Sequence, residues 1–231
     1  MQVVRKKEKL MCVITVIASR HSELGRCNSD ELYKILERLS PDAIFEEVPP
    51  GKFPAVYAGR LRDSLETSTI KRYLEQYPTV HHAVDLEIDQ ETYSHFRKAV
   101  RSMTWIFNDR SPEYNRLSYE LQQATEQFGF PYLNSDECSE LLARKRVLEV
   151  DMTCDLKLEK LSETHRHWLD LIDRRRDEMI KNIYEHIKLH NYNQTRFIVG
   201  AEHRKPIRDK IGAFEKWNGR GPKWDFDYLT S

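Results

Sequence analysis

Short apolar runs alternate with amphipathic stretches along the first third of the chain. The run at 12–18 is rich in β-branched residues and bounded by polar ones, which is typical of a buried strand. Two shorter strands are predicted at 43–47, which ends in Glu46 and Glu47, and at 80–84. Between them, apolar residues recur every three or four positions, as in helices that pack on a sheet. Because single helices separate the strands, the pattern predicts βαβ crossovers and a parallel sheet.

Breaks and caps set the expected ends of these elements. Ser29 is expected to cap the first helix, and Pro41 to end it. The sequence Pro-Pro-Gly at 49–51 stops the second strand. A further helix is predicted over 65–76, before the third strand.

The middle of the chain predicts a helical insertion over 90–190. Its expected helices lie at 91–106, 112–127, 136–148 and 155–189. A last strand follows at 196–199, then a further helix, and 219–222 is expected to be irregular. We therefore expect one α/β domain over 1–231, with a mostly parallel sheet built from βαβ units and long flanking helices.

Composition narrows the range of partners. Lys and Arg together number 37, and so do Asp and Glu, so no net field recruits nucleic acid or an anionic membrane. No apolar run approaches the roughly 20 residues of a membrane span. The four cysteines, Cys12, Cys27, Cys138 and Cys154, lie far apart and form no CxxC pair, which favours reduced thiols over disulfides or zinc.

The start of the chain has two interpretations. Lys6, Lys7 and Lys9 precede an apolar run over 10–19, which has the outline of a signal peptide. The same run suits the first buried strand, and the strand–helix alternation that follows favours this second interpretation. The expected location is therefore the cytoplasm.

Ionisable side chains follow each predicted strand. His21 follows the first strand, Glu46 and Glu47 the second, and Asp85 the third, while Glu202 and His203 follow the last. Ligands of an open parallel sheet bind beyond the carboxyl ends of its strands. If the four strands are parallel, these groups share one edge, and imidazoles with carboxylates suit a divalent metal or an acid–base pair.

A family resemblance rests on residues at these strand ends. Residues 18–21 (ASRH) and 200–203 (GAEH) resemble the two GxxH-type motifs of the Tiki/TraB/GumN family, which is related to the ChaN-like and erythromycin-esterase-like proteins. Residues 41–46 (PDAIFE) are similar to its second strand, and Val84-Asp85 to the end of its third. Residues 175–179 (RRDEM) resemble its E-R-D/N-x-x-M element on the long helix before the final strand. The resemblance covers most of the chain in order.

The resemblance implies an α/β fold with a polar site at the strand ends. Tiki-like members are metal-dependent peptide hydrolases, esterase-like members hydrolyse a lactone without a metal, and ChaN-like members bind haem. The family position in the second strand favours Glu46 over Glu47, which points to the opposite face of the strand.

Each candidate also has a purely structural interpretation. His21 and His203 can be ordinary loop or helix-start residues, and Asp85 can simply begin a turn. Arg176 lies on the apolar stripe of the long helix, four residues from both Ile172 and Ile180, and so needs a carboxylate or ligand partner. A structural salt bridge to Glu46 or Asp85 would meet that need.

Our first hypothesis is a hydrolase of a peptide, ester or other small carbonyl substrate. His21, His203 and Glu46 would hold a divalent metal such as Zn, Mn, Fe or Co, which acidifies a bound water. In a metal-free version, His21 is the base, Glu46 orients it and Arg176 stabilises the oxyanion, with His203 also catalytic. Glu47, Arg62, Asp85 and Glu202 are the predicted substrate-binding residues.

Two other classes stay open. A binding or regulatory module would use the same edge to hold an anion, a peptide or haem, with Tyr and Trp of the middle helices as a lid. A helical interaction protein would use the stripe of the long helix, although so wide a stripe usually packs on its own sheet. A homodimer through the middle helices also stays open. No GxSxG elbow, HExxH helix or Gly-rich phosphate loop is present.

Overall fold

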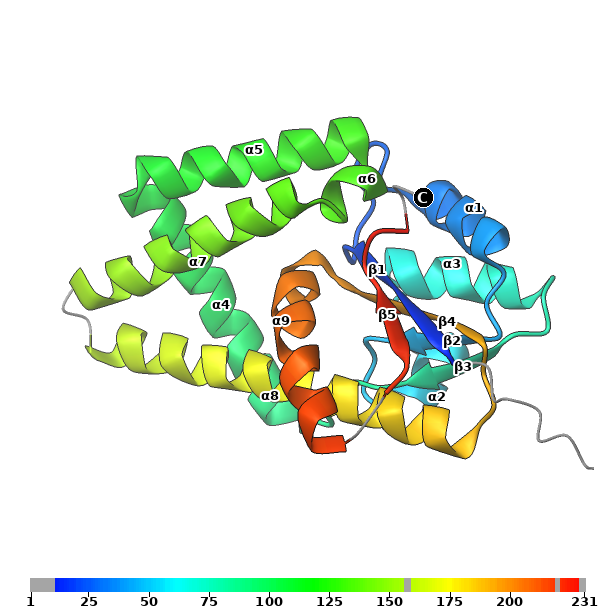
Figure 1. Cartoon of the computed structure of the whole chain (residues 1–231). Coiled ribbons are helices and arrows are strands. Elements are labelled where there is room, and N and C mark those ends of the chain that lie inside the picture. The colour runs from blue at the N-terminus through cyan, green and yellow to red at the C-terminus, as the bar shows by residue number, and fades with distance from the viewer. Residues whose placement is uncertain (1–10, 156–158, 219–220, 229–231) are drawn as a thin grey trace, which may run out of the picture.

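The computed structural model describes residues 11–155, 159–218 and 221–228 (Figure 1). One all-parallel sheet of five strands lies at its centre, in the order β3-β2-β4-β1-β5. The strands are β1 (Val13–Ser19), β2 (Ala43–Glu46), β3 (Val80–Ala83), β4 (Gln194–Gly200) and β5 (Lys223–Asp225). The α/β class with a parallel sheet is thus confirmed.

Strand β5 was not predicted, because the chain near 219–222 was expected to be irregular. It pairs with β1 from Val13↔Lys223 to Thr15↔Asp225. With three residues, one Trp between two charged side chains, it carries no periodic signal. Residues 219–220 lie outside the described part of the chain, as do the lysines at 6, 7 and 9.

The predicted helices are present with shifted ends, and the short helices α2 (Phe53–Tyr57) and α6 (Phe130–Leu133) were not predicted. The helices of the first third are α1 (Ser29–Leu39), α2 and α3 (Leu65–Leu74). The cap of α1 is Asn28, not Ser29, because the Asn28 side chain accepts a hydrogen bond from the Glu31 N–H at 3.0 Å. At the other end of the chain, α9 (Ala201–Asn218) follows β4 without a loop.

The helical insertion lies between β3 and β4. It consists of α4 (Gln90–Arg110), α5 (Pro112–Phe128), α6 (Phe130–Leu133), α7 (Asp136–Asp155) and α8 (Glu159–Leu189). Helix α7 is longer than the predicted 136–148, and residues 156–158 of the predicted long helix lie outside the described residues. Figure 1 shows α4, α5, α7 and the first half of α8 extending away from the sheet.

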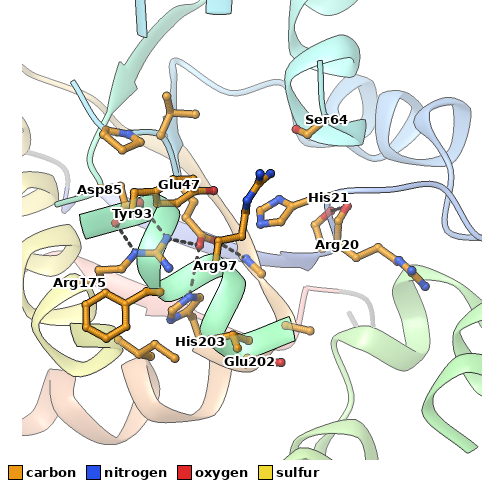
Figure 2. A pocket seen from close by; sticks show the side chains of 18 of the residues that line it. Arg20, His21, Glu47, Ser64, Asp85, Tyr93, Arg97, Arg175, Glu202 and His203 are labelled. Carbon is orange, nitrogen blue, oxygen red and sulfur yellow. Dashed lines mark hydrogen bonds and ion pairs between the residues drawn. The ribbon is translucent and has the colours of Figure 1, made fainter. Parts of the chain in front are cut away.

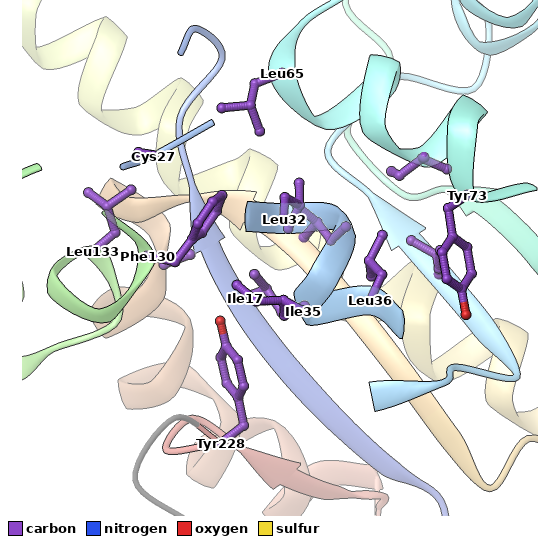
Figure 3. Packing of buried hydrophobic residues seen from close by; sticks show 14 of the residues in the cluster. Ile17, Cys27, Leu32, Ile35, Leu36, Leu65, Tyr73, Phe130, Leu133 and Tyr228 are labelled. Atoms are coloured by element: carbon purple, nitrogen blue, oxygen red, sulfur yellow. The ribbon is translucent and has the colours of Figure 1, made fainter. Parts of the chain in front are cut away.

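Alternation along the strands gives the sheet two apolar faces. Ile17, Ile44 and Ile198 face α1 and α3, in the cluster of Figure 3. Val16 and Phe45 point the other way, toward the second half of α8 and α9, where they meet residues such as Met179, Ile183 and Ile207. The sheet is therefore covered on both sides, as parallel sheets require.

The insertion is fastened to the carboxyl end of β1. The Ala18 N–H donates to Asn134 Oδ1 at 2.8 Å, and Asn134 Nδ2 donates to the Ala18 carbonyl at 3.0 Å. Nearby, Gly25 has φ +53°, and a Cβ there would lie 2.3 Å from the Glu126 carbonyl oxygen. The Asn134 side chain and the close approach of Gly25 to Glu126 thus hold the loop after β1, which carries His21, against the insertion.

Strand order brings three carboxyl ends together. Because β4 lies between β1 and β2, the residues after these three strands are neighbours at one edge of the sheet. The shared edge expected from the sequence is therefore present. Among the described residues, no helix is both long and apolar enough to cross a membrane.

Candidate functional site

A cavity of about 940 Å³ opens between the carboxyl ends of the strands and the helical insertion. Its polar side is formed by residues from the strand ends, and its apolar side by helices of the insertion (Figure 2). The apolar lining is Phe96, Val100, Leu121, Leu133, Leu142, Trp168, Leu171 and Ile172. The volume is in the range of small-molecule sites.

The floor of the cavity is a buried ion-pair network. Arg175 Nη2 donates to Glu47 Oε1 at 2.6 Å and to Asp85 Oδ2 at 2.8 Å, while Arg175 Nε donates to Asp85 Oδ1 at 3.0 Å. The side chains of Glu47 and Asp85 are 7% and 5% exposed. One guanidinium from α8 therefore pairs with carboxylates that follow two different strands.

Glu47 also contacts the end of β4 and the first turn of α9. The Gly200 N–H donates to Glu47 Oε2 at 2.7 Å, and His203 Nε2 lies 3.3 Å from Glu47 Oε1. Burial by itself would raise the pKa of Glu47, but the interactions with His203 and Arg175 lower that pKa well below its ordinary value. Glu47 is therefore a fixed anion and a poor proton acceptor.

His203 is held at both ring nitrogens. Its Nδ1 accepts a hydrogen bond from Arg176 Nε at 3.2 Å, on the side away from Glu47. A nitrogen that accepts from a guanidinium carries no proton, so the proton of the ring lies on Nε2, toward Glu47. His203 is thus oriented by one arginine and one carboxylate.

His21 lies at the side of the cavity on the loop after β1. The Leu65 N–H donates to the His21 carbonyl at 3.0 Å, which ties this loop to the first turn of α3. On that turn, Glu66 Oε1 lies 3.5 Å from His21 Nδ1. The hydrogen bond with Glu66 raises the pKa of His21 above its ordinary value, against the opposing effect of burial. The side chain is 69% exposed and lines the cavity.

The structure corrects the choice between Glu46 and Glu47. Glu46 points to the other face of the sheet, where it accepts from Tyr57 OH at 2.6 Å and meets His81 Nδ1 at 2.7 Å. It does not line the large cavity, which Glu47 does. The reason is strand alternation: Glu47 continues the face of Phe45, whereas Glu46 continues that of Ile44.

A similar shift by one residue applies to Arg176. It forms no salt bridge to Glu46 or Asp85, and it lines a neighbouring cavity instead of the large one. Arg175 takes the predicted position beside the carboxylates. It lies three residues after Ile172 and four before Met179, so the same apolar stripe could have indicated it.

The predicted metal ligands do not form one set. His21, His203 and Glu46 were expected to hold a divalent ion, but Glu46 faces away, and both nitrogens of His203 contact protein groups. Among the described residues, no three His, Cys, Asp or Glu side chains are arranged to hold a metal ion. The residues present therefore do not fit the expected metal.

The remaining predicted residues lie where the sequence suggested. Arg62, Asp85 and Glu202 line the large cavity, and Glu202 is also 3.4 Å from Arg146. Cys27, in the loop near His21, is fully buried, and burial raises the pKa of its thiol to about 12. A thiol nucleophile at that position is thus excluded.

Several cavity residues escaped the sequence analysis. Glu66, which contacts His21 but does not itself line the large cavity, carries no motif and is found only through the contact between α3 and the His21 loop. Arg20, Lys52 and Arg97 add positive charge around the opening, and Tyr93 lies with Arg97 on α4 (Figure 2). Their helical spacing, four residues apart in α4, could have placed Tyr93 and Arg97 on one face.

Comparison with known protein families, with curated proteins and with solved structures gives no match for this chain. The resemblance to the Tiki/TraB/GumN family therefore rests on the short motifs described above.

Proposed function

We propose that this protein is a hydrolase of small anionic carbonyl compounds, esters or peptides, and that His21 is its acid–base residue. The observation that carries the proposal is that His21, paired with Glu66, and Arg175 line the same cavity. A carboxylate behind an imidazole fixes its tautomer and stabilises the protonated form. A guanidinium in the same cavity can stabilise negative charge on a carbonyl oxygen.

His21 can serve both proton transfers of a hydrolysis. With Nδ1 turned to Glu66, neutral His21 accepts a proton at Nε2 from the water that attacks the carbonyl carbon. The imidazolium then gives this proton to the leaving oxygen or nitrogen as the tetrahedral intermediate breaks down. Glu66 stabilises the imidazolium between the two steps.

Arg175 supplies the donor for the oxyanion. Its Nε and Nη2 are used by Glu47 and Asp85, whereas Nη1 has no hydrogen-bond partner among the described residues and is not buried. Glu47 and Asp85 hold the guanidinium in place, which makes them positioning residues. His203 acts in the same way through Glu47.

The charges and apolar walls indicate the substrate class. Four cations line the polar side of the cavity: Arg20, Lys52, Arg62 and Arg97. Besides the paired Glu47 and Asp85, the only described carboxylate of the lining is Glu202. This surplus of cations favours an anionic group on the substrate. The apolar helices opposite accommodate an aliphatic or aromatic body.

The metal-free version of the hydrolase is the one we retain. Among the family resemblances, it corresponds to the esterase-like members, which hydrolyse a lactone without a metal. The buried thiols of Cys27 and Cys138, and the absence of disulfides among the four cysteines, support our proposal of a cytoplasmic protein.

A panel of chromogenic esters and amides tests the proposal. Each compound is offered with and without a carboxylate group, to protein dialysed against a chelator. We expect turnover of a carboxylate-bearing ester, insensitive to the chelator and lost in His21→Gln. Turnover that depends on added metal, or that persists in His21→Gln, would refute this mechanism.

A binding module is the second candidate, because ion pairs hold Glu47, Asp85, Arg175 and His203 in fixed positions. Such a network can serve as a rigid floor for a bound anion, peptide or haem with no chemistry. Spectral titration with haemin addresses the haem case, and a Soret shift at stoichiometric haemin would favour it. Binding of the carboxylate-bearing esters and amides without any turnover would favour a module that binds an anion or a peptide.

A further inference from the structure

A second cavity, of about 630 Å³, lies wholly between helices. Residues from α4, α5, α7, α8 and α9 line it, and no strand reaches it. It adjoins the first cavity, since Val100, Leu142, Trp168, Ala201 and Glu202 line both. Its apolar lining includes Met103 and Phe107.

A buried polar cluster lies on this second cavity. Glu149 accepts from Tyr114 OH at 2.9 Å and from Arg146 Nη1 at 2.6 Å. His165 is only 3% exposed, and its Nε2, 3.5 Å from Glu149 Oε2, has no hydrogen-bond partner. The Glu149 carboxylate is thus the one close partner of this nitrogen among the described residues, at a distance longer than an ordinary hydrogen bond, so a second acceptor on the cavity side would stabilise the ring.

Two cations of the cavity also lack a close carboxylate. The Arg176 side chain is 13% exposed, and the carboxylate nearest to it among its ion pairs, that of Asp173, is 3.8 Å away. Lys145 lies over the Tyr114 ring, 4.5 Å from its centroid, and forms no ion pair with a described carboxylate. Burial lowers the pKa of both groups, as expected for cations whose charge is poorly compensated.

The other cations of the cavity are already neutralised. Lys205 Nζ lies 2.7 Å from Asp209 Oδ2, and Arg146 pairs with Glu149 at 2.6 Å. Glu202, the other carboxylate of the lining, pairs with Arg146 at 3.4 Å. Among the described residues this leaves Lys145 without an ion pair and Arg176 with only the 3.8 Å pair to Asp173. A ligand that supplies negative charge near them would offset the desolvation of both cations and give the His165 ring a hydrogen-bond partner.

We propose that the second cavity is a separate binding site for a small oxyanion ligand, a phosphate or carboxylate compound held by Lys145, Arg176 and His165. The apolar walls at Met103, Phe107 and Leu142 take the body of such a ligand. This site is independent of the reaction assigned to the first cavity. Its occupant would nevertheless contact Arg176, which donates to His203 in the first cavity.

Inorganic phosphate is the probe for the anionic part of this site. It is titrated at constant ionic strength into the isotope-labelled full chain, and the imidazole resonances of His165 and His21 are followed by NMR. We expect saturable shifts at His165 with little change at His21. Lys145→Gln and Arg176→Gln should each weaken phosphate binding about tenfold.

Matched variants control for general charge effects. Lys205→Gln removes a cation of the same cavity that already has a carboxylate partner, and Arg62→Gln removes one from the first cavity. Both should change the affinity for phosphate less than about threefold. Thermal unfolding of each variant verifies that it is folded, and Lys145→Gln, at a partly exposed side chain, serves if Arg176→Gln does not fold.

Two results would overturn the proposal. The first is the absence of saturable shifts at His165 with tens of millimolar phosphate. The second is binding that Arg62→Gln weakens and Lys145→Gln leaves unchanged, which would place phosphate in the first cavity. Neither result concerns turnover of the esters and amides, so the hydrolase proposal is tested independently of this binding site.

Discussion

Arg175 on α8 donates to Glu47 after β2 at 2.6 Å and, through the same nitrogen, to Asp85 after β3 at 2.8 Å. The three side chains are almost buried, so their charges are screened little by water. This contact joins the helical insertion to two strand ends and forms the floor of the large cavity. It also explains why two acidic residues are tolerated there.

Removal of the guanidinium should destabilise the fold. Arg175→Met leaves two buried carboxylates without a cation, and we expect a loss of about 3–5 kcal/mol in the free energy of unfolding. Urea denaturation followed by circular dichroism measures it. The control is Arg174→Met on the exposed side of α8, which should change stability by less than about 0.5 kcal/mol. Equal effects of the two variants would argue against the network.

The corrected position of the carboxylate gives a second prediction. Glu47→Gln weakens the ion pair that holds Arg175, so turnover of the carboxylate ester should fall about a hundredfold. Glu46→Gln should leave it within about threefold, because Glu46 contacts Tyr57 and His81 outside the cavity. Steady-state kinetics of the two variants measures these effects. A larger loss of turnover in Glu46→Gln than in Glu47→Gln would indicate that Glu46 belongs to the site.

The pair of His21 and Glu66 predicts a specific pH dependence. The pKa of His21 should lie above 6.5, its ordinary value, and return toward it in Glu66→Gln. Because neutral His21 must accept the first proton, kcat/KM should rise with pH and level off above that raised pKa. NMR titration of the imidazole and the pH–rate profile measure the same group. An inflection that does not move in Glu66→Gln would contradict the role of the pair.

A stack of histidines away from the site predicts that the folded protein loses stability at acidic pH. His82 and His186 have ring centroids 4.0 Å apart, with His190 5.8 Å from His82. Burial, and then the neighbouring imidazoles, lower the pKa of His82 to about 4. The unfolded chain therefore binds a proton at this residue below pH 6.5, whereas the folded chain does so only near pH 4.

Stability should accordingly be full above pH 6.5 and fall as the pH drops toward 4, by about 2 kcal/mol from His82. His82→Phe should flatten this part of the stability–pH curve, while the exposed His95→Gln should leave it unchanged. Urea denaturation at pH 7.5, 6 and 5 provides the comparison. A curve for His82→Phe that runs parallel to wild type would show that the stack does not titrate as described.

The fold followed from apolar runs, but the strand order did not. The strands at 12–18, 43–47 and 196–199 are predictable because each buries side chains on both faces. The strand at 80–84 lies at the edge of the sheet and is only partly buried. That β4 inserts between β1 and β2 depends on long-range packing, which periodicity does not encode. Strand β5 escaped notice because three residues are too few for a pattern.

Two of the predicted site residues, Glu46 and Arg176, do not line the large cavity, whereas their neighbours Glu47 and Arg175 do. The prediction of Glu46 followed a family motif, whereas that of Arg176 followed both a motif and the apolar stripe of α8, on which Arg175 and Arg176 are neighbours. Strand alternation from Phe45 indicates Glu47, and spacing from Met179 indicates Arg175. Glu66 is different, because it lies on α3, far along the chain from His21, and no motif links the two residues. Only the tertiary structure reveals their contact.

The most direct test of a hydrolytic site at these strand ends is a comparison of His21→Gln with wild type and with His95→Gln on α4. Turnover and binding of one carboxylate-bearing ester are measured for all three proteins after dialysis against a chelator. We predict that His21→Gln loses at least about a hundredfold in kcat and binds the ester within about threefold of wild type, whereas His95→Gln matches wild type in both. Equal turnover in His21→Gln and wild type, or binding by wild type with no turnover at all, would contradict a hydrolase that depends on His21.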